Sequence, residues 1–272
     1  MTSVIVWLDL EYDNESFEQP FIWPRDIWLA ADSRISGTSA QHRSGYRTLT
    51  DYAPKILPIQ YTFYRNNEDA PGVRLAYSGE IGFAYAGNTL PANLTYSMIC
   101  ASFIRMTAEC GSVLPSLDDM VKFITRVGGY YARETQSCFE LFVTGTCPRD
   151  QHSGVQVFHL SLWSKSQPSY HKLILDSDHR MYMIGNRKQE LRVTCGAGFA
   201  NDISYSPAEA LAALIAETAI DEVGGLLSIA RVERLGGITL FPKYVTAVLA
   251  RLGYPMFNGE RFGSVGEFKV GA

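Results

Sequence analysis

The chain has 272 residues, 46% of them hydrophobic, which is enough to bury a sizeable core in one large α/β domain or two small ones. Its net charge of −4 at pH 7, with no Lys/Arg block longer than a dipeptide, gives no reason to expect nucleic acid or an anionic membrane as a partner. No apolar run approaches the roughly 20 residues that span a bilayer, and no basic region precedes an apolar run at the N-terminus, so we expect neither a membrane segment nor a signal peptide.

Strand-like segments dominate the first third of the chain. Apolar alternation and β-branched runs predict strands over residues 2–12, 25–34, 56–64 and 73–77. The acidic stretch 9–18 is expected to be a solvated hairpin tip, and the Ser/Thr/Gly/Arg-rich stretch 36–52 an exposed loop.

Helices and strands alternate in blocks along the rest of the chain. Helices are predicted near 89–107, over 117–133 behind a Ser116 cap, and from Pro207 to about 222. Strands are predicted over 138–146, 155–163, 171–176, 180–184, 190–195, 226–233 and 237–241.

This order suggests an α+β fold in which two antiparallel sheets stack between helical layers, a four-layer αββα sandwich. Periodicity alone does not choose this arrangement over other α+β folds. We expect one domain over residues 1–242 and a C-terminal extension over 243–272, which begins with an amphipathic segment and ends in a Gly-rich tail.

The cysteines and histidines do not predict a metal site. The five cysteines are scattered, odd in number and show no CxxC pairing, so we expect reduced, mostly buried thiols in a cytoplasmic protein. The five histidines include no HExxH, and no Cys/His spacing resembles a zinc site. No P-loop, GxSxG or dinucleotide GxGxxG occurs either, so we expect no metal and no cofactor.

Three residues far apart in the sequence could together activate a nucleophile. A threonine hydroxyl is a poor nucleophile without a base, but if Met1 is removed, the α-amine of Thr2, with a pKa of about 7.7–8.0, can accept its proton directly or through a water. A nearby lysine would lower the proton affinity of the threonine, and a buried aspartate would hold that lysine charged and oriented. Lys55 and Asp32 could supply these roles.

Each of these residues also has an ordinary interpretation. Thr2 is a small residue after the initiator, Asp32 before Ser33 is a turn former, and Lys55 after Pro54 is a surface charge. The functional interpretation depends on their joint occurrence, in this order, after apolar strand-like runs.

Three segments carry a resemblance to a known family. They are Leu29-Ala30-Ala31-Asp32-Ser33-Arg34, Lys55-Ile56-Leu57-Pro58-Ile59 and Leu75-Ala76-Tyr77-Ser78-Gly79. In this order, after Thr2, they resemble the proteasome β-subunit group of N-terminal-nucleophile (Ntn) hydrolases, in particular its bacterial branch.

The resemblance implies the αββα fold and a threonine-type peptidase. Thr2, Asp32 and Lys55 would be catalytic, Gly79 would donate its N–H to the oxyanion hole, and Ser3 and Arg34 would support the site. Peptides or unfolded proteins would be the substrates, the chain would assemble into a homo-oligomeric ring, and an ATP-dependent unfoldase could feed it.

The sequence also departs from the family pattern. The family's Gly-Ser-Gly has its best counterpart in Gly196-Ala197-Gly198, or in another register at Asn186, and neither supplies a serine. The serine before the family's last Gly-Gly pair is replaced by Val223, and the aspartate is displaced to Asp221. The alternative is therefore a catalytically inactive subunit of the same fold that acts as a scaffold or binding module. An amidase acting on a small molecule or a modified peptide would share the same site.

Overall fold

The computed structural model describes eleven stretches of the chain. They are residues 2–12, 22–38, 46–51, 53–66, 72–108, 112–150, 152–176, 179–199, 207–216, 223–233 and 237–241. The predicted C-terminal extension at 243–272, the displaced Asp221 and the acidic residues 13–18 lie outside these stretches.

One sheet contains the N-terminal strand as an inner strand. Its order is β11 (Met181–Gly185), β1 (Ser3–Tyr12), β2 (Ile22–Asp32), β12 (Leu227–Val232) and β13 (Ile238–Leu240), and all neighbours are antiparallel. Val4, Ile5 and Val6 of β1 are fully buried. A strand that is covered on both faces reads as a continuous apolar run, which explains this part of the sequence.

The second sheet has six strands. Its order is β10 (Ser169–Leu173), β9 (Val155–Trp163), β8 (Cys138–Thr146), β6 (Val73–Gly87), β5 (Ile56–Asn66) and β7 (Met106–Ala108). Only β7 pairs in parallel, because α1 (Thr89–Phe103) carries the chain across before β7 joins β5.

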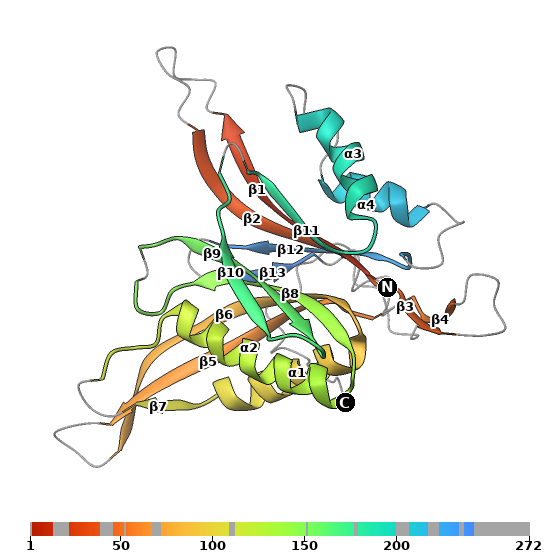
Figure 1. Ribbon diagram of the computed structural model, residues 1–272. Coiled ribbons are helices and arrows are strands. Elements are labelled where there is room, and N and C mark those ends of the chain that lie inside the picture. The colour runs from red at the N-terminus through yellow and green to blue at the C-terminus, as the bar shows by residue number, and fades with distance from the viewer. Residues whose placement is uncertain are drawn as a thin grey trace, which may run out of the picture.

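Helices cover the outer face of each sheet (Figure 1). α1 and α2 (Leu117–Glu134) pack on the six-stranded sheet in a core that includes Phe83, Ile99 and Ile124. α3 (Lys188–Phe199) and α4 (Pro207–Ala216) pack on the five-stranded sheet against Ile5 and Ala30. Ser116 and Asp119 form a reciprocal capping box that fixes the start of α2, as the sequence predicted.

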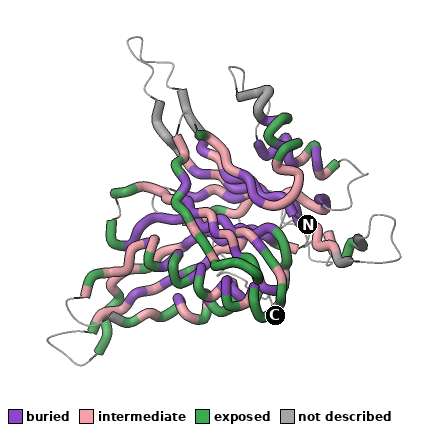
Figure 2. The backbone as a smooth tube through the Cα atoms, viewed as in Figure 1, coloured by how far each residue is buried: buried purple, intermediate pink, exposed green. Residues whose placement is uncertain are grey.

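A third core lies between the two sheets. Side chains of β1 and β2, such as Val4 and Leu29, meet side chains of β6 and β8, such as Ala84 and Phe142. The buried residues accordingly run through the middle of the tube in Figure 2. The α+β class is thus confirmed, and the inner faces of the two sheets face each other. No helix within the described stretches is long and apolar enough to cross a membrane.

Two predicted elements are wrong. Residues 190–195, predicted as a strand, belong to helix α3. Leu191 and Cys195 are both buried and lie four positions apart, which is a helical spacing. The β-branched pair Val193-Thr194 between them suggested a strand instead. The predicted exposed loop 36–52 contains a small hairpin of β3 (Ile35–Thr38) and β4 (Tyr46–Thr50). Its polar composition hid the β-branched residues that favour strands.

Candidate active site

Asp32 ends strand β2 and is fully buried. Its carboxylate accepts hydrogen bonds from the backbone N–H groups of Ser3 (2.8 Å), Arg34 (3.3 Å) and Gly224 (3.3 Å). Burial raises the pKa of Asp32, while the Lys55 ammonium and the N–H donors oppose that rise. The donors come from three separate segments, so the carboxylate joins β1, the turn after β2 and the segment before β12.

Lys55 lies just before strand β5 and is also fully buried. Its Nζ donates to Thr2 Oγ1 and to the Arg34 carbonyl oxygen, and lies 3.4 Å from Asp32 Oδ2. Burial lowers the pKa of Lys55, the attraction of Asp32 opposes this, and the positive charge of Arg34 adds to it. The Lys55 carbonyl accepts from the Tyr85 N–H at 3.1 Å, so the backbone of this lysine is anchored to β6.

Thr2 and Ser3 are held against the end of strand β11. The Thr2 carbonyl accepts from the Asn186 N–H at 2.9 Å, and Ser3 Oγ donates to the Asn186 carbonyl at 2.5 Å. Gly185 has φ of +88°, and a side chain there would overlap the Thr2 carbonyl. The start of β1 therefore packs directly on a backbone turn that only glycine can form.

Arg34 supports the cluster from the side. Its Nε donates to Asp51 Oδ1 at 2.7 Å, and its guanidinium fills the space where a side chain on Gly224 would lie. Ser33 and Arg34 both donate their N–H groups to the Gly224 carbonyl, at 3.2 and 3.0 Å. The structure thus brings five of the six predicted site residues together: Thr2, Ser3, Asp32, Arg34 and Lys55.

Gly79 is the exception, and its assignment to an oxyanion hole is wrong on this geometry. It pairs with Tyr61 in the middle of β6, five residue steps along the ladder from the Ile56–Ala84 pair, or about 17 Å. A Cβ at Gly79 would lie 2.5 Å from the Tyr61 hydroxyl, so this glycine makes room for a buried ring.

Gly87, at the other end of β6, is the glycine that sequence reasoning missed. Its φ is +107°, and it follows Ala86, which lies beside Gly185 at the Thr2 end of the sheets. The Ala86-Gly87 dipeptide at the end of a buried run was the available signal. The sequence interpretation chose the earlier Gly79 because the segment Leu75 to Gly79 resembled the family pattern.

The two expected departures from the family pattern have different outcomes. Residues 196–198 lie within helix α3, whereas Asn186, the other register, contacts Thr2 and Ser3 through its backbone. Val223 is fully buried and packs in the core under α3 and α4. An apolar side chain therefore stands directly before Gly224.

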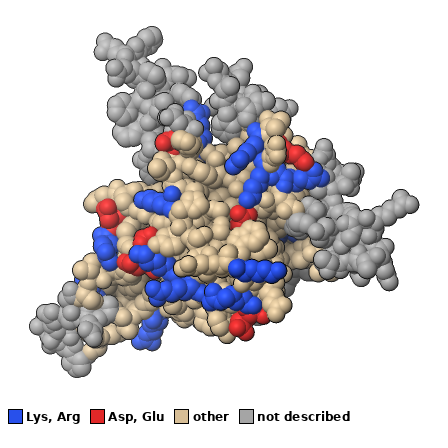
Figure 3. Space-filling view, viewed as in Figure 1, with Lys and Arg blue, Asp and Glu red and all other residues tan. Residues whose placement is uncertain are grey.

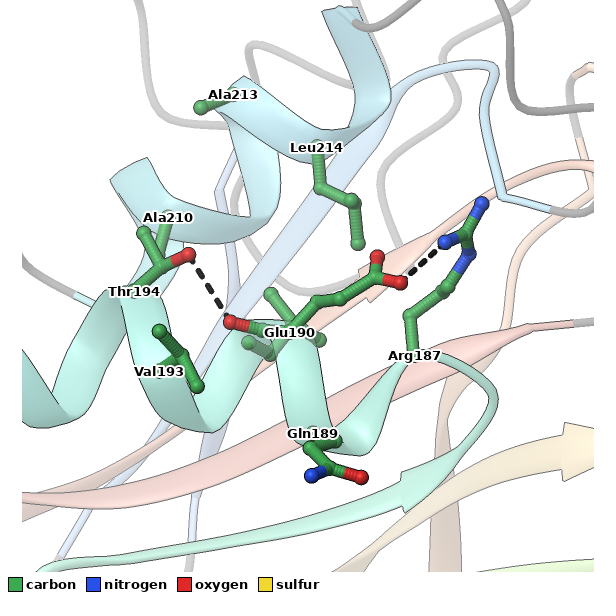
Figure 4. A pocket seen from close by; sticks show the side chains of 9 residues that line it. Arg187, Gln189, Glu190, Val193, Thr194, Ala210, Ala213 and Leu214 are labelled. Carbon is green, nitrogen blue, oxygen red and sulfur yellow. Dashed lines mark hydrogen bonds and ion pairs between the residues drawn. The ribbon is translucent and has the colours of Figure 1, made fainter.

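The structure has a hollow of about 580 Å³ between α3 and α4 (Figure 4). It is lined by Arg187, Gln189, Glu190, Leu191, Val193, Thr194, Ala210, Ala213 and Leu214. None of these residues belongs to the cluster around Thr2. The face in Figure 3 carries scattered lysines and arginines among mostly uncharged residues. Within the described stretches, no group of three His, Cys, Asp or Glu side chains is placed to hold a metal ion.

Solved structures of Anbu proteins resemble this chain. The helical assembly of the Anbu complex from Pseudomonas aeruginosa has a TM-score of 0.50 at 10% identity, covering 93% of this chain and 92% of that one. Anbu from Hyphomicrobium sp. strain MC1 has a TM-score of 0.50 at 11% identity, covering 93% and 95%. Anbu (ancestral beta-subunit) from Yersinia bercovieri has a TM-score of 0.48 at 14% identity, covering 93% of each chain.

At these identities the likeness shows the fold alone. It also corrects the expected relationship: the similar structures are Anbu proteins, which are proteasome-like but distinct from the proteasome β-subunit branch that the sequence motifs suggested. No protein-family model matches the sequence, and no curated protein matches it either.

Proposed function

We propose that this protein is an N-terminal-threonine amide hydrolase that cleaves peptides, with Thr2 as nucleophile after Met1 is removed. The observation that carries the proposal is the contact of Thr2 Oγ1 with the Lys55 ammonium, whose Nζ lies 3.4 Å from Asp32, in a fully buried cluster. Burying the charges of Lys55 and Asp32 costs free energy. Their placement beside Thr2 therefore favours a chemical role over a structural one.

The chemistry follows from these groups. Lys55 stabilises negative charge on Thr2 Oγ1, and Asp32 orients the lysine through its own three backbone donors. Oγ1 attacks the amide carbon while the freed α-amine takes its proton, directly or through a water. The C–N bond then breaks, the leaving amine takes that proton, and water hydrolyses the resulting ester. No step needs a metal or a cofactor.

Gly87 replaces Gly79 in this proposal as the oxyanion donor. It ends β6 on the side where Tyr85 binds Lys55 and Ala86 approaches Gly185. Tyr85 directs its N–H toward β5, and alternation along a strand directs the N–H of Gly87 to the same side, two residues later. A backbone donor at this position would stabilise the charge that develops on the scissile carbonyl.

The fold and the similar structures support further parts of the proposal. Two facing sheets with α1–α2 on one outer side and α3–α4 on the other are consistent with the four-layer αββα sandwich of Ntn hydrolases. One similar structure is a helical assembly, so we propose that this chain also forms a homo-oligomer. The same proposal includes peptides or unfolded proteins as substrates, an ATP-dependent unfoldase as partner and a cytoplasmic location.

A second candidate function is a catalytically inactive subunit that acts as a scaffold or binding module. The observation that favours it is Val223, a fully buried apolar residue where the proteasome-type pattern has a serine. In this case the buried Thr2–Lys55–Asp32 cluster would only hold the N-terminus in place.

The experiment that tests the proposal measures hydrolysis of a panel of fluorogenic peptide amides. The purified protein should release fluorophore, and Thr2→Ala should reduce the rate to background while leaving the oligomeric state by light scattering unchanged. Thr48→Ala, at an exposed position of strand β4, is the matched control and should keep the full rate. Equal rates for Thr2→Ala and the wild type would contradict the nucleophile, and no turnover by any form would favour the scaffold.

A further inference from the structure

We infer that Glu140 is a positioning residue that holds Thr2 in register by fixing the backbone turn against which Thr2 packs. This inference rests on the proposed function for its kinetic consequence, but its structural part stands by itself. Glu140 belongs to β8 in the six-stranded sheet, whereas the turn that it fixes ends β11 in the five-stranded sheet. The residue therefore links the two sheets beside the candidate active site.

The contacts of the Glu140 carboxylate come from both sheets and from α3. Oε2 accepts the Gly185 N–H at 3.0 Å, and both oxygens accept from Lys188 Nζ at 3.0 and 3.1 Å. Oε1 also lies 3.2 Å from His159 Nε2 on β9. The side chain is only 17% exposed, so these partners replace most of the water that a carboxylate normally binds.

The turn that Glu140 holds is the one that binds the N-terminal residues. Gly185, fixed by Glu140, is followed by Asn186, whose N–H donates to the Thr2 carbonyl and whose carbonyl accepts from Ser3 Oγ. Lys188, also fixed by Glu140, begins α3 two residues later. One carboxylate thus anchors the turn on both sides of the residue that contacts Thr2.

A carboxylate is suited to this role because it can accept several donors at once. Charge-assisted bonds of this kind are shorter and stronger than bonds between neutral groups. The charged and titratable groups around Glu140 are Lys188 on α3, His159 on β9 and His171 on β10, whose ring stacks edge-on against His159 at 5.0 Å. Glu140 is the acidic residue among them.

The structural part is tested by amide hydrogen exchange on the full-length protein, followed in peptides that cover residues 2–8 and 181–188. Glu140→Leu removes every acceptor at similar volume, and Glu140→Gln keeps one. We expect exchange at Gly185 and Asn186 to rise at least about tenfold in Glu140→Leu and less in Glu140→Gln. Glu134→Gln, at an exposed position in the last turn of α2, is the control and should match the wild type.

The kinetic part uses a β-lactone, which acylates a reactive threonine as its ring C–O bond opens and the ring oxygen takes the hydroxyl proton. Misplacement of a reacting group by about 1 Å can cost a hundredfold in rate. We expect the maximal acylation rate at Thr2 to fall roughly ten- to hundredfold in Glu140→Leu, with unchanged half-saturating lactone concentration. Lys188→Met removes one of the two anchors but leaves the carboxylate on Gly185, so its rate should fall less than that of Glu140→Leu.

The outcomes separate the inference from the proposed function. If the wild type is acylated and Glu140→Leu and Glu140→Gln react at the same rate as it does, the inference is wrong. If the wild type is not acylated at all, the proposed function is wrong, and hydrogen exchange decides the inference alone. Unchanged exchange at Gly185 and Asn186 in both Glu140 variants overturns it in either case.

Discussion

The two ends of strand β6 differ sharply in burial and in what they contact. At the Gly87 end, residues 81–86 are buried, the Tyr85 N–H donates to the Lys55 carbonyl, and Ala86 lies beside Gly185, the turn residue that packs on Thr2. At the Val73 end, the residues are mostly exposed, and Leu75 is 59% accessible. Gly79 and Gly87 of this strand therefore have different roles. Gly79 leaves room for the Tyr61 ring in one half, and Gly87 lies at the candidate active site at the end of the other.

The difference has a physical origin in what covers each half. The Gly87 half faces the five-stranded sheet, where Ala84 and Ala86 pack in one apolar core with Val4 of β1 and Ile184 of β11. The Val73 half pairs with the distal part of β5, and there the backbone next to Gly79 meets the ring of Tyr61. Substitutions at the two ends should therefore separate loss of reactivity from loss of stability.

The largest effect is expected from Lys55→Met at the buried end. The change leaves the Asp32 carboxylate buried without its cation, which typically costs about 3–5 kcal/mol in the free energy of unfolding. Acylation of Thr2 should become undetectable, because the substitution removes the ammonium that contacts Oγ1 and favours its ionised form. Urea unfolding and intact-mass measurement after β-lactone treatment check both effects.

The control for this change is a lysine that is also paired but lies on the surface. Lys122 bridges Asp118 at 2.7 Å on α2, and both side chains are exposed. Lys122→Met should leave unfolding and acylation unchanged, because exposed ion pairs contribute little. Equal effects of the two substitutions would contradict a special role for the buried pair.

The next effect concerns pH and Glu140, which lies opposite Ala86 on β8. Burial alone would raise the pKa of Glu140. The hydrogen bonds from His159, Gly185 and Lys188 outweigh burial and lower this pKa from 4.5 to about 2. A lowered pKa stabilises the folded state above about pH 4.5, and this contribution is lost as the pH falls toward 2. Integrated over that window it amounts to at most ~3 kcal/mol.

Urea unfolding of the wild type and Glu140→Gln between pH 6 and pH 2 measures this contribution. Other carboxylates titrate in both proteins, so the difference between the two curves isolates Glu140. The stability difference should be largest near pH 6 and shrink toward pH 2. A difference that stays constant with pH would show that the carboxylate charge does not stabilise the fold.

Gly87→Ala should affect both stability and reactivity. Its φ of +107° is unfavourable for alanine, and a Cβ would lie 2.9 Å from both the Cys138 carbonyl oxygen and the Phe139 Cα, which are backbone atoms that cannot rotate away. We expect a loss of about 2 kcal/mol in the free energy of unfolding. The acylation rate should fall as well, since the proposed oxyanion donor moves. Thermal unfolding and β-lactone kinetics on the same samples test both.

Gly79→Ala should affect stability alone, so its overall effect is the smallest. The added Cβ would lie 2.5 Å from the Tyr61 hydroxyl and 2.7 Å from the ring carbon that bears it, so the buried ring must move to make room, and about 1–3 kcal/mol is expected. The acylation rate should equal that of the wild type, because the site lies five residue steps away along the ladder. A rate loss as large as that of Gly87→Ala would restore Gly79 to the site.

Much of the fold was predictable because local patterns agreed with tertiary packing. The apolar run that ends at Asp32, the Ser116 cap and the apolar strand residues of β8 and β9 each have one consistent structural interpretation. The errors lie where patterns conflict: β-branched residues in α3 suggested a strand, and polar residues in β3 and β4 suggested a loop. The pairing of β11 beside β1 also depends on long-range contacts that periodicity does not contain.

The candidate site was predictable as residue types and only partly as geometry. Thr2, Asp32 and Lys55 converge as expected, because each lies at the same end of a strand that crosses the core. Gly79 was misplaced because the resemblance was read at Leu75 to Gly79, in the middle of β6, and not at the Ala86-Gly87 dipeptide that ends this strand. Glu140 was missed altogether, since its partners Gly185 and Lys188 are 45 and 48 residues away and no local pattern marks a carboxylate that is largely shielded from water.

The measurement that tests the central claim most directly is the intact mass of the purified full-length protein before and after β-lactone treatment, with fragmentation to locate the adduct. We predict a chain without Met1 that gains one lactone mass on residue 2, and no gain in Thr2→Ala. A chain that retains Met1 and gains no adduct would contradict the account, because a blocked Thr2 amine cannot act as the base.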